Sequence, residues 1–276
     1  PVIVWPQSSI MLYSRWTSSL TSFVLESVPS GSGGRAIGMA KKIVEMLIES
    51  VKMELPDTKT IRLKWPEDYG VEFKTGQFIT LYWPDTPKYK RAYSLSSCVL
   101  DTGHFEVTVK RDGKMGTRIV DWAKEGDTLF VIQPTGRFLP VLKPEKHLIC
   151  IAGGSGVTPF RAYAREATRT GQKTKITVLY SVRTTNDIIF NEEFRELESQ
   201  NPHFKFLVTC TRLDENDPWD GRRGRIDSDW IEDQVVDLPN TVFYACGPTA
   251  LVEGTEKLVV EKMGLPKEQI RLEKWG

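Results

Sequence analysis

A change of pattern near Pro144 constrains the fold of this chain more than any other feature of its sequence. After this proline, short apolar segments alternate with segments of helical periodicity as far as the C-terminus. Strands that alternate with helices build a parallel sheet, and the helices cover both of its faces. The segments expected to be strands are 147–152, 175–181, 204–211, 241–246 and 270–274, and the expected helices are 159–170, 191–199, 229–235 and 249–263.

The residues before Pro144 follow a different pattern, in which short strands are separated by turns and helices are rare. Turn-forming pairs such as Pro56-Asp57 and Pro84-Asp85 divide these strands. The expected strands are 43–54, 60–64, 77–83, 92–96, 105–110 and 128–133, with one helix over 117–124. Short strands with few helices indicate a small antiparallel β-barrel. The sequence thus predicts two domains, a β-barrel over residues 41–143 and an α/β parallel-sheet domain over residues 144–276.

Residues 1–40 differ from both domains. They are rich in Ser, Thr and Gly, nearly free of acids, and end in the linker-like run from Pro29 to Gly34. The chain begins with Pro1 and not Met, so we expect a start that is missing or processed. The composition loosely resembles an organellar transit peptide, and the alternative is a plain N-terminal extension.

Composition excludes several classes of protein. With 40% hydrophobic and 26% charged residues the chain is ordinary and globular, and a net charge of +1 does not favour nucleic acid. The cysteines Cys98, Cys150, Cys210 and Cys246 are scattered, so we expect no disulfide framework, no metal site and no iron–sulfur cluster. No apolar run reaches membrane-spanning length. We therefore expect a cytoplasmic protein without a membrane span; the oligomeric state is not predicted.

Three short motifs carry chemistry. In the expected strand 92–96 and the residue before it, Arg91 can pair with a phosphate and Tyr93 offers a flat face to a heterocycle, while Ser94 lies on the opposite strand face. The run Gly153-Gly154-Ser155-Gly156 joins an apolar strand to a helix, where backbone N–H groups can bind phosphate. Cys246-Gly247-Pro248 ends a later strand, at the edge where parallel sheets open their ligand crevice.

Each motif also has a structural interpretation. The first can be an ordinary strand with an exposed arginine, the second a tight turn, and the third a small buried thiol before a turn. The order and spacing of the three motifs favour the functional interpretation over the structural one. Together, over about residues 41–276, they resemble the ferredoxin–NADP reductase superfamily, and especially oxygenase reductase components and cytochrome-b-type reductases. The resemblance implies FAD in the barrel and NADPH or NADH in the second domain.

The resemblance also implies roles for single residues on the flavin side. Arg91 would pair with the flavin pyrophosphate, Tyr93 would stack on the isoalloxazine ring, and Ser94 would hydrogen-bond near its N5. The run Gly113-Lys114-Met115-Gly116-Thr117 resembles the family's Gly-Lys-Met-Ser turn, which binds pyrophosphate through backbone N–H groups. Gly116 replaces the usual serine, so a side-chain contact there would have to come from Thr117. The other flavin-binding residues implied by the resemblance are Ala92 and Lys110.

On the nicotinamide side, Cys246 would lie beside the nicotinamide C4, and Glu273 would join a network of hydroxyl and thiol groups. Trp275 would cover the flavin face that the nicotinamide must reach; its alternative is an ordinary aromatic residue. The predicted catalytic residues are therefore Ser94, Cys246 and Glu273. The nucleotide-binding residues that the resemblance implies are Gly153, Gly154, Gly156, Val157, Thr158, Pro159, Arg183, Thr211, Arg212, Arg223, Gly247 and Pro248.

The choice of nicotinamide cofactor depends on Thr211 and Arg212, which follow a sheet strand where the adenine ribose should rest. An acidic residue there would repel a 2′-phosphate, whereas Thr and Arg permit it, so NADPH is slightly favoured over NADH. Arg223 belongs to a loop that resembles one in oxygenase reductases, and its alternative role is in a solvated surface loop.

The predicted activity is transfer of a hydride from NAD(P)H to FAD, followed by single-electron transfer to a separate redox protein: a ferredoxin, a flavodoxin, a heme protein or an oxygenase component. Lys88, Lys90 and Lys114 could steer an acidic acceptor or form a solvated face. The alternatives are a nucleotide-binding, non-catalytic subunit, a reductase fragment of a larger heme or oxygenase flavoprotein, and, among enzymes, a free-flavin or ferric reductase.

Overall fold

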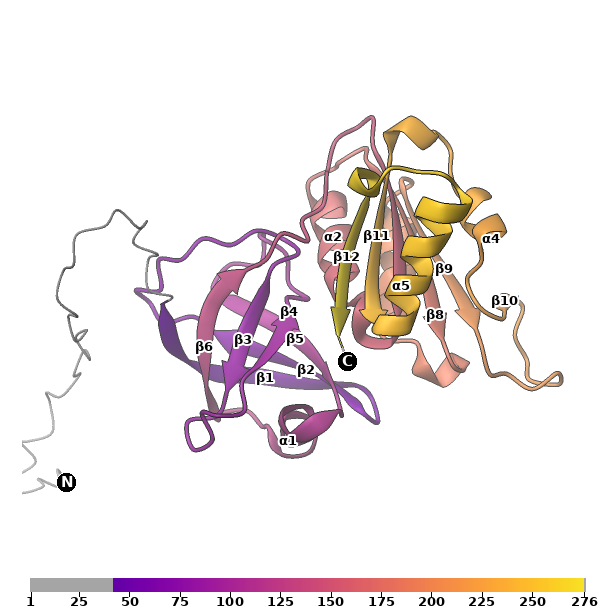
Figure 1. Cartoon of the computed structure of the whole chain (residues 1–276). Coiled ribbons are helices and arrows are strands. Elements are labelled where there is room, and N and C mark those ends of the chain that lie inside the picture. Colours follow the sequence, from indigo (N-terminus) through magenta and orange to yellow (C-terminus); the bar gives the residue numbers. More distant parts are fainter. Residues whose placement is uncertain (1–41, 276) are drawn as a thin grey trace, which may run out of the picture. The chain divides into compact units, whose positions relative to one another are not determined.

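A computed structural model describes residues 42–275 of the chain (Figure 1). The predicted N-terminal extension and its possible targeting role lie outside the described residues. The described residues all belong to one compact unit of the chain, residues 41–276.

The first half of the described chain is an antiparallel sheet with a single helix inserted into it. Its strands are β1 (Ile43–Leu55), β2 (Thr58–Lys64), β3 (Phe78–Tyr82), β4 (Arg91–Ser94), β5 (His104–Lys110) and β6 (Thr128–Thr135). They lie in the order β4-β3-β6-β1-β2-β5, with α1 (Gly113–Trp122) between β5 and β6 in sequence.

The two edge strands of this sheet approach each other. Just beyond β4, Leu95 forms a bridge with Val107 of β5, and the Ser96 N–H donates to the Glu106 carbonyl at 2.8 Å. The curled sheet encloses a core that includes Ile48, Ile61 and Leu81, all fully buried. The predicted antiparallel barrel is confirmed.

The second half is a parallel sheet covered on both faces. The strands β7 (His147–Gly153), β8 (Lys175–Val182), β9 (Phe204–Cys210), β10 (Arg222–Arg223), β11 (Thr241–Pro248) and β12 (Ile270–Trp275) lie in the order β10-β9-β8-β7-β11-β12. The helices are α2 (Thr158–Arg169), α3 (Asn191–Gln200), α4 (Ser228–Glu232) and α5 (Thr249–Lys257). The predicted α/β domain is also confirmed.

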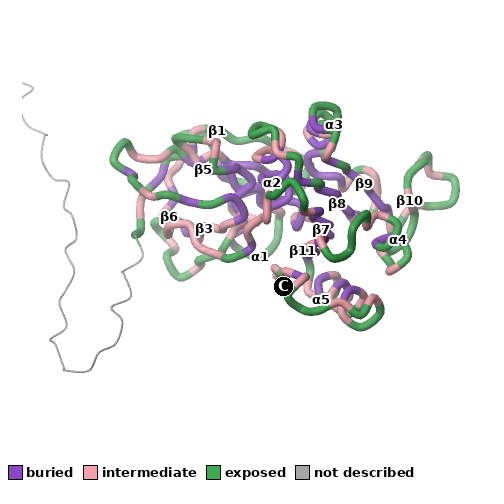
Figure 2. The backbone as a smooth tube through the Cα atoms, turned by 90° about the horizontal axis from the view of Figure 1, so that it is seen from above, coloured by how far each residue is buried: buried purple, intermediate pink, exposed green. Residues whose placement is uncertain are grey.

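Two buried clusters show which helix covers which face of this sheet. Side chains of α2 and α3 share one cluster, for example Phe160 and Phe194, whereas those of α4 and α5 share another with Trp230 and Val252. Figure 2 shows α3 and α5 on opposite sides of the buried strands. The hydrophobic effect therefore stabilises the sheet from both sides, as the uninterrupted burial of β7 requires.

The strand order reverses direction between β7 and β11. The chain runs from β7 outward through β8 and β9, then returns to add β11 on the other side of β7. In open α/β sheets, ligands bind beyond the carboxyl ends of the strands at such a reversal. Both glycine-containing motifs of this domain lie at this point.

Several elements differ from the prediction in their bounds. Helix α1 begins at Gly113 instead of residue 117, because Gly113 takes a left-handed φ of 56° that turns the chain directly into the helix. The expected helix 249–263 is α5 followed by a single π-turn over Leu258–Lys262. Strand β10 was not expected, since two residues carry no readable alternation.

Candidate functional site

The strand β4 presents the first motif at an edge of the barrel. Arg91 and Ala92 are exposed, and the Arg91 guanidinium donates to the neighbouring Lys90 carbonyl at 3.2 Å. Tyr93 is half-buried against the barrel core, and burial raises the pKa of its phenol. Ser94 is also half-buried. The strand therefore offers a free cation, an aromatic side chain and a hydroxyl within a single stretch.

The start of α1 is open to a ligand. Within the described residues, Asp112 makes no side-chain hydrogen bond that caps the helix, and no heavy atom lies within 4 Å of the position a Gly113 Cβ would take. The first N–H groups of a helix carry a partial positive charge and bind anions. A cavity of about 740 Å³ adjoins them, lined by Gly113, Lys114, Thr117, Arg118 and Trp122.

Some side chains of α1 line the cavity, and others pack in the barrel core. Thr117 and Lys114 line the cavity. Met115 is 3% exposed and packs in the barrel core, and a Cβ on Gly116 would lie 2.5 Å from the Lys110 carbonyl oxygen. These two residues therefore reach a ligand only through their backbone. Gly116 departs from the family pattern because α1 packs too tightly on the end of β5 for any side chain.

Lys110 already forms an ion pair within the protein, since its ammonium lies 3.1 Å from the Asp57 carboxylate.

The sequence analysis missed Arg118 and Trp122. Lys114, Arg118 and Trp122 are spaced by four residues and so share one face of α1, and this spacing is the signal that could have found them.

The turn after β7 and the turn at the end of β11 pack directly on each other. A Cβ on Gly156 would lie 2.1 Å from the Cys246 carbonyl oxygen, and one on Gly247 would lie 3.1 Å from the Gly153 backbone. Gly156 and Gly247 allow this backbone contact, whereas a side chain on Gly153 would meet the side chains of Leu251 and Pro248. Gly154 has a φ of 53° and open space around it among the described residues, so it is the glycine that leaves room for a ligand.

Val157, Thr158 and Pro159 lead from this turn into α2 and are buried. The Thr158 hydroxyl donates to the Ser155 carbonyl at 2.7 Å, which closes the turn. Pro159 lies in the first turn of α2, where a missing N–H costs nothing. Pro248 is exposed at the end of β11.

The three residues predicted to be catalytic lie together. The Ser94 hydroxyl donates to Glu273 Oε1 at 2.5 Å, and the Cys246 sulfur lies 4.0 Å from the same oxygen. Cys246 and Glu273 are register partners on the adjacent strands β11 and β12. A hydroxyl from the barrel thus meets a carboxyl and a thiol from the sheet, at the point where the strand order reverses.

Burial determines the protonation of this cluster. It raises the pKa of the Glu273 carboxyl, and the hydrogen bond from Ser94 opposes that rise only in part. It also raises the pKa of the fully buried Cys246 thiol, with the nearby Glu273 acting in the same direction. Cys246 is therefore a neutral S–H group at neutral pH, and Glu273 holds a proton more readily than an ordinary glutamate.

Trp275 lies two residues beyond Glu273, on the same face of β12. It is register partner to Pro248, and its carbonyl accepts a hydrogen bond from Thr249 at 3.4 Å. Its ring is partly buried against the core that includes Phe138 and Tyr244. The structure thus brings the aromatic ring to the end of β11 that also carries Cys246.

The structure brings together only some of the residues expected near the ribose. The Arg212 N–H donates to the Arg183 carbonyl at 2.8 Å, which joins the ends of β8 and β9. Both arginines are exposed, and neither guanidinium has a hydrogen-bond partner among the described residues. The Thr211 hydroxyl donates to the Val182 carbonyl at 2.9 Å, whereas Arg223 donates to the carbonyls of Asp214 and Asp217. Arg223 therefore holds its own loop together.

Two further observations concern metal binding and membrane-spanning helices. In the part of the chain that the structure describes, no three His, Cys, Asp or Glu side chains gather where they could hold a metal ion. The helices of that same part include none that is long and apolar enough to cross a membrane.

Comparison with known proteins agrees with this arrangement. Residues 45–139 match the family described as oxidoreductase FAD-binding domain, and residues 150–257 match the oxidoreductase NAD-binding domain. A glycine betaine monooxygenase reductase subunit from Chromohalobacter salexigens is 32% identical over 208 residues, which cover 74% of this chain and 56% of that protein. The chain thus spans little more than half the length of this relative.

Other relatives extend the comparison. The reductase component of a propane 2-monooxygenase from Rhodococcus jostii is 27% identical over 86% of this chain and 65% of its own length. A ferredoxin–NADP reductase B from Sorangium cellulosum is 26% identical over 84% of this chain and 97% of its own length.

Among solved structures, a ferredoxin NADP⁺ reductase from Neisseria gonorrhoeae with bound FAD and NADP shares the fold, with a TM-score of 0.71 and 24% identity. The match covers 85% of this chain and 99% of that one. With a flavin-binding barrel, a nucleotide-binding parallel sheet and both family matches in sequence, this chain belongs to the ferredoxin–NADP reductase superfamily.

Proposed function

We propose that this protein is a FAD-dependent NAD(P)H oxidoreductase that passes a hydride from the nicotinamide to FAD and then single electrons to a separate protein. The observation that carries this proposal is the contact of Ser94 with Glu273, and of Glu273 with Cys246. The cluster joins β4 of the barrel to the ends of β11 and β12. A half-buried hydroxyl and carboxyl beside a buried thiol at that junction suit a reaction between two cofactors, each held by one domain.

The barrel supplies groups that suit FAD. The exposed Arg91 and the free N–H groups at the start of α1 would hold the pyrophosphate. Tyr93 would offer its ring to the isoalloxazine, with Ala92 and Ser94 beside it. The cavity along α1 then leaves room for the adenosine half, with the adenine on the exposed ring of Trp122. The donors and the open space fit the cofactor.

The second domain supplies groups that suit a dinucleotide. The turn Gly153–Val157 and the N-terminus of α2 would hold its pyrophosphate, and Gly247 would let the nicotinamide approach Cys246. Arg183 and Arg212 are exposed at neighbouring strand ends. Positions 211 and 212 carry a threonine and an arginine, so no acidic side chain there would repel a 2′-phosphate. We therefore propose NADPH over NADH. Residues 41–143 form the proposed flavin domain and residues 144–276 the proposed nucleotide domain.

When bound, FAD supplies the chemistry that links two-electron hydride transfer to single-electron transfer. The protein's own part is orientation and polarity. Ser94 donates to Glu273, so its hydroxyl is held in one direction at the flavin edge of β4. Cys246 stays a neutral thiol, since burial raises its pKa, and beside a bound nicotinamide it would exclude water without adding charge. Trp275 would cover the flavin face until the nicotinamide arrives.

The electron acceptor is proposed from the relatives. Several are reductase components of oxygenases, so an oxygenase component is the first acceptor to test, ahead of a ferredoxin, a flavodoxin or a heme protein. Lys88 and Lys114 are exposed, and their ammonium groups lie over the Tyr89 ring. An acidic acceptor would meet this positive edge close to Arg91.

An absorbance experiment tests the proposal. The purified protein, loaded with FAD, should show a flavin band that bleaches on anaerobic addition of NADPH, and more slowly with NADH. A faster reaction with NADH would reject the nucleotide preference alone. A protein that stays colourless in excess FAD, or a flavin that neither nucleotide reduces, would reject the proposed oxidoreductase.

A further inference from the structure

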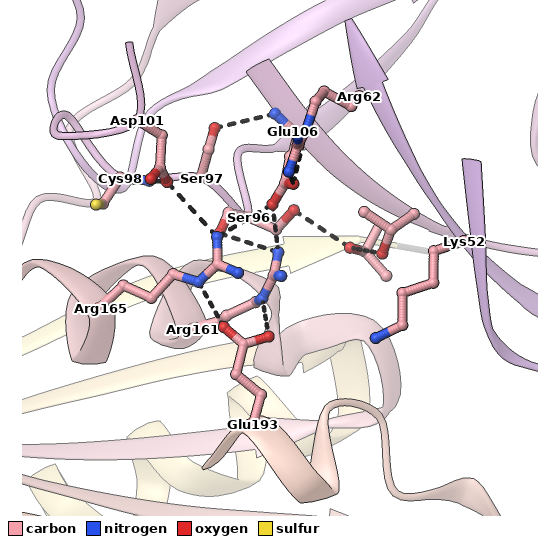
Figure 3. A network of polar contacts seen from close by, with 12 residues as sticks. Lys52, Arg62, Ser96, Ser97, Cys98, Asp101, Glu106, Arg161, Arg165 and Glu193 are labelled. Atoms are coloured by element: carbon pink, nitrogen blue, oxygen red, sulfur yellow. Dashed lines mark hydrogen bonds and ion pairs between the residues drawn. The ribbon is translucent and has the colours of Figure 1, made fainter. Parts of the chain in front are cut away.

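Helix α2 carries three arginines, Arg161, Arg165 and Arg169, at intervals of four residues. This spacing places them on one face of the helix. All three bind groups outside the helix, and we name them, with the acids Asp101, Glu106 and Glu193, the arginine ladder. Figure 3 shows Arg161 and Arg165 with these three acids.

The two inner arginines bridge the barrel and α3. Arg161 pairs with Glu106 Oε2 and with Glu193 Oε2, each at 2.8 Å. Arg165 pairs with Glu193 Oε1 at 2.5 Å and with Glu106 Oε2 at 3.1 Å. Glu106 belongs to β5 and Glu193 to α3, so each guanidinium joins the two domains through its own nitrogen atoms.

The outer arginine adds a further contact to the barrel. Arg169 pairs with Asp101 and donates to the Leu100 carbonyl at 3.0 Å. Asp101 is also 3.6 Å from Arg165. The ladder thus follows the length of α2 and touches the barrel at more than one level.

The innermost pair is almost fully buried. The side chains of Arg161 and Glu106 are 5% and 6% exposed. Moving such charges out of water costs several kcal/mol, and apolar residues often replace a buried ion pair without loss of stability. Stability alone therefore gives little reason for the pair. A directional contact that selects one arrangement of two packed parts gives a better one.

The Arg161 end of the ladder adjoins the candidate site through elements of both domains. Helix α2 begins directly after the turn Gly154–Val157. Glu106 is tied to the segment after Ser94, because its N–H donates to the Ser97 hydroxyl at 3.0 Å and its carbonyl accepts from the Ser96 N–H. Arg161 also reaches the Ser96 carbonyl at 3.5 Å. The ladder connects the proposed nucleotide turn to the proposed flavin strand.

We propose that the arginine ladder is a positioning device for hydride transfer. It fixes α2 and its turn against the segment after Ser94, and so sets the distance between the nicotinamide held by one domain and the flavin held by the other. This inference rests on the proposed function. None of the ladder residues touches the reacting atoms; they act through the elements that do.

The guanidinium fork is the part that performs this task. Arg165 reaches Glu193 with Nε and Glu106 with Nη1. A lysine keeps the charge but has one ammonium group, which is not shaped to bridge two carboxylates. Arg165→Lys therefore separates the role of geometry from that of charge. Arg195→Lys is the matched control, because Arg195 pairs with Glu198 within α3, away from the barrel.

The test compares FAD-loaded wild type, Arg165→Lys, Glu106→Gln and Arg195→Lys in anaerobic stopped-flow mixing with NADPH. A misplacement near 1 Å can cost about 100-fold in rate, so we expect flavin bleaching to slow at least about tenfold in the two ladder variants. The FAD content and the NADPH dissociation constant should stay within about twofold of wild type, because the ladder binds neither cofactor. Arg195→Lys should react like wild type.

The outcomes separate the possible failures. Ladder variants that keep FAD and bleach as fast as wild type would overturn the inference, even if they unfold more easily. If Glu106→Gln does not fold, Arg169→Gln, at the exposed end of the ladder, takes its place with the same expectation of slower bleaching. A wild type that never bleaches would overturn the proposed function and this inference with it.

Discussion

At the scale of single residues, Trp122 is the clearest departure from ordinary packing. Its ring is 74% exposed at the end of α1, in line with Lys114 and Arg118 along the cavity. Large apolar surface exposed beside a cavity favours a ligand. FAD differs from FMN by its adenosine monophosphate half, so comparing the two flavins separates contacts to that half from contacts to the part they share.

We expect Trp122→Ala to raise the dissociation constant for FAD by about 10- to 100-fold, since stacking of one base contributes about 1–3 kcal/mol. Binding of FMN should be unchanged, because FMN has no adenine. Titration of the apoprotein with each flavin, followed by flavin fluorescence, measures both constants. Trp122→Phe, which keeps a ring, is the control. Equal weakening of FAD and FMN would contradict an adenine site.

Glu273 gives a second prediction at this scale. Burial raises the pKa of its carboxyl above the value near 4.5 expected for the unfolded chain. The folded state therefore holds the proton more tightly, and folding stability falls as the pH rises from about 4.5 through the raised pKa. Glu273→Gln should remove this part of the pH dependence.

Urea unfolding of wild type and Glu273→Gln at a series of pH values measures that difference. The free energies of unfolding should diverge in favour of the variant as the pH rises through this window. Parallel pH profiles would show that the carboxyl titrates as it does in the unfolded chain, and that the site does not hold it protonated.

At the scale of elements, the packing of α1 on β5 explains a departure from the family. A side chain at position 116 meets the Lys110 carbonyl oxygen, since a Cβ there would lie at 2.5 Å. Gly116→Ser, which introduces the residue usual in the family, should therefore destabilise the protein by about 1–3 kcal/mol. Thermal unfolding measures the change.

Gly254 provides the control for this substitution. It lies in α5 with open space around its Cβ position among the described residues, so Gly254→Ser should be neutral or stabilise by up to about 1 kcal/mol. If both serines had the same effect, helix propensity and not the contact with Lys110 would account for the glycine at position 116.

Element by element, the sequence predicts the fold better than it predicts the surroundings of the site. The meeting of Cys246 with Glu273 could be anticipated, because neighbouring parallel strands end at the same edge. The reason for Gly156 could not, since it depends on a carbonyl oxygen 90 positions away. The pairing of Arg161 with Glu106 also spans 55 positions, and in the sequence these are two charged residues among many.

At the scale of the whole molecule, Glu106 at the junction of the two domains makes folding stability depend on pH in the acidic range. Buried beside Arg161 and Arg165, it has its pKa lowered to about 2, since the arginines outweigh the cost of burial. The unfolded value is near 4.5, so the stabilising contribution is present above pH 4.5 and is lost as the pH falls toward 2.

We expect wild type to lose stability between pH 4.5 and 2, and Glu106→Gln to lose less over the same range because the glutamine amide takes up no proton there. Chemical unfolding at several pH values, followed by circular dichroism, measures this. An unchanged acid transition in the variant would mean that Glu106 does not couple protonation to folding.

The contact between the turns at Gly156 and Gly247 has a consequence for how such a site can change over generations. The Cys246 carbonyl lies where a Gly156 side chain would begin, so a methyl group gained there must displace the backbone that carries the thiol. The exposed residues Arg183 and Arg212, proposed to lie at the ribose end of the nucleotide site, have no such restriction. If the proposed site is correct, single mutations there could alter the preferred coenzyme, whereas a side chain at position 156 would require a second, compensating change.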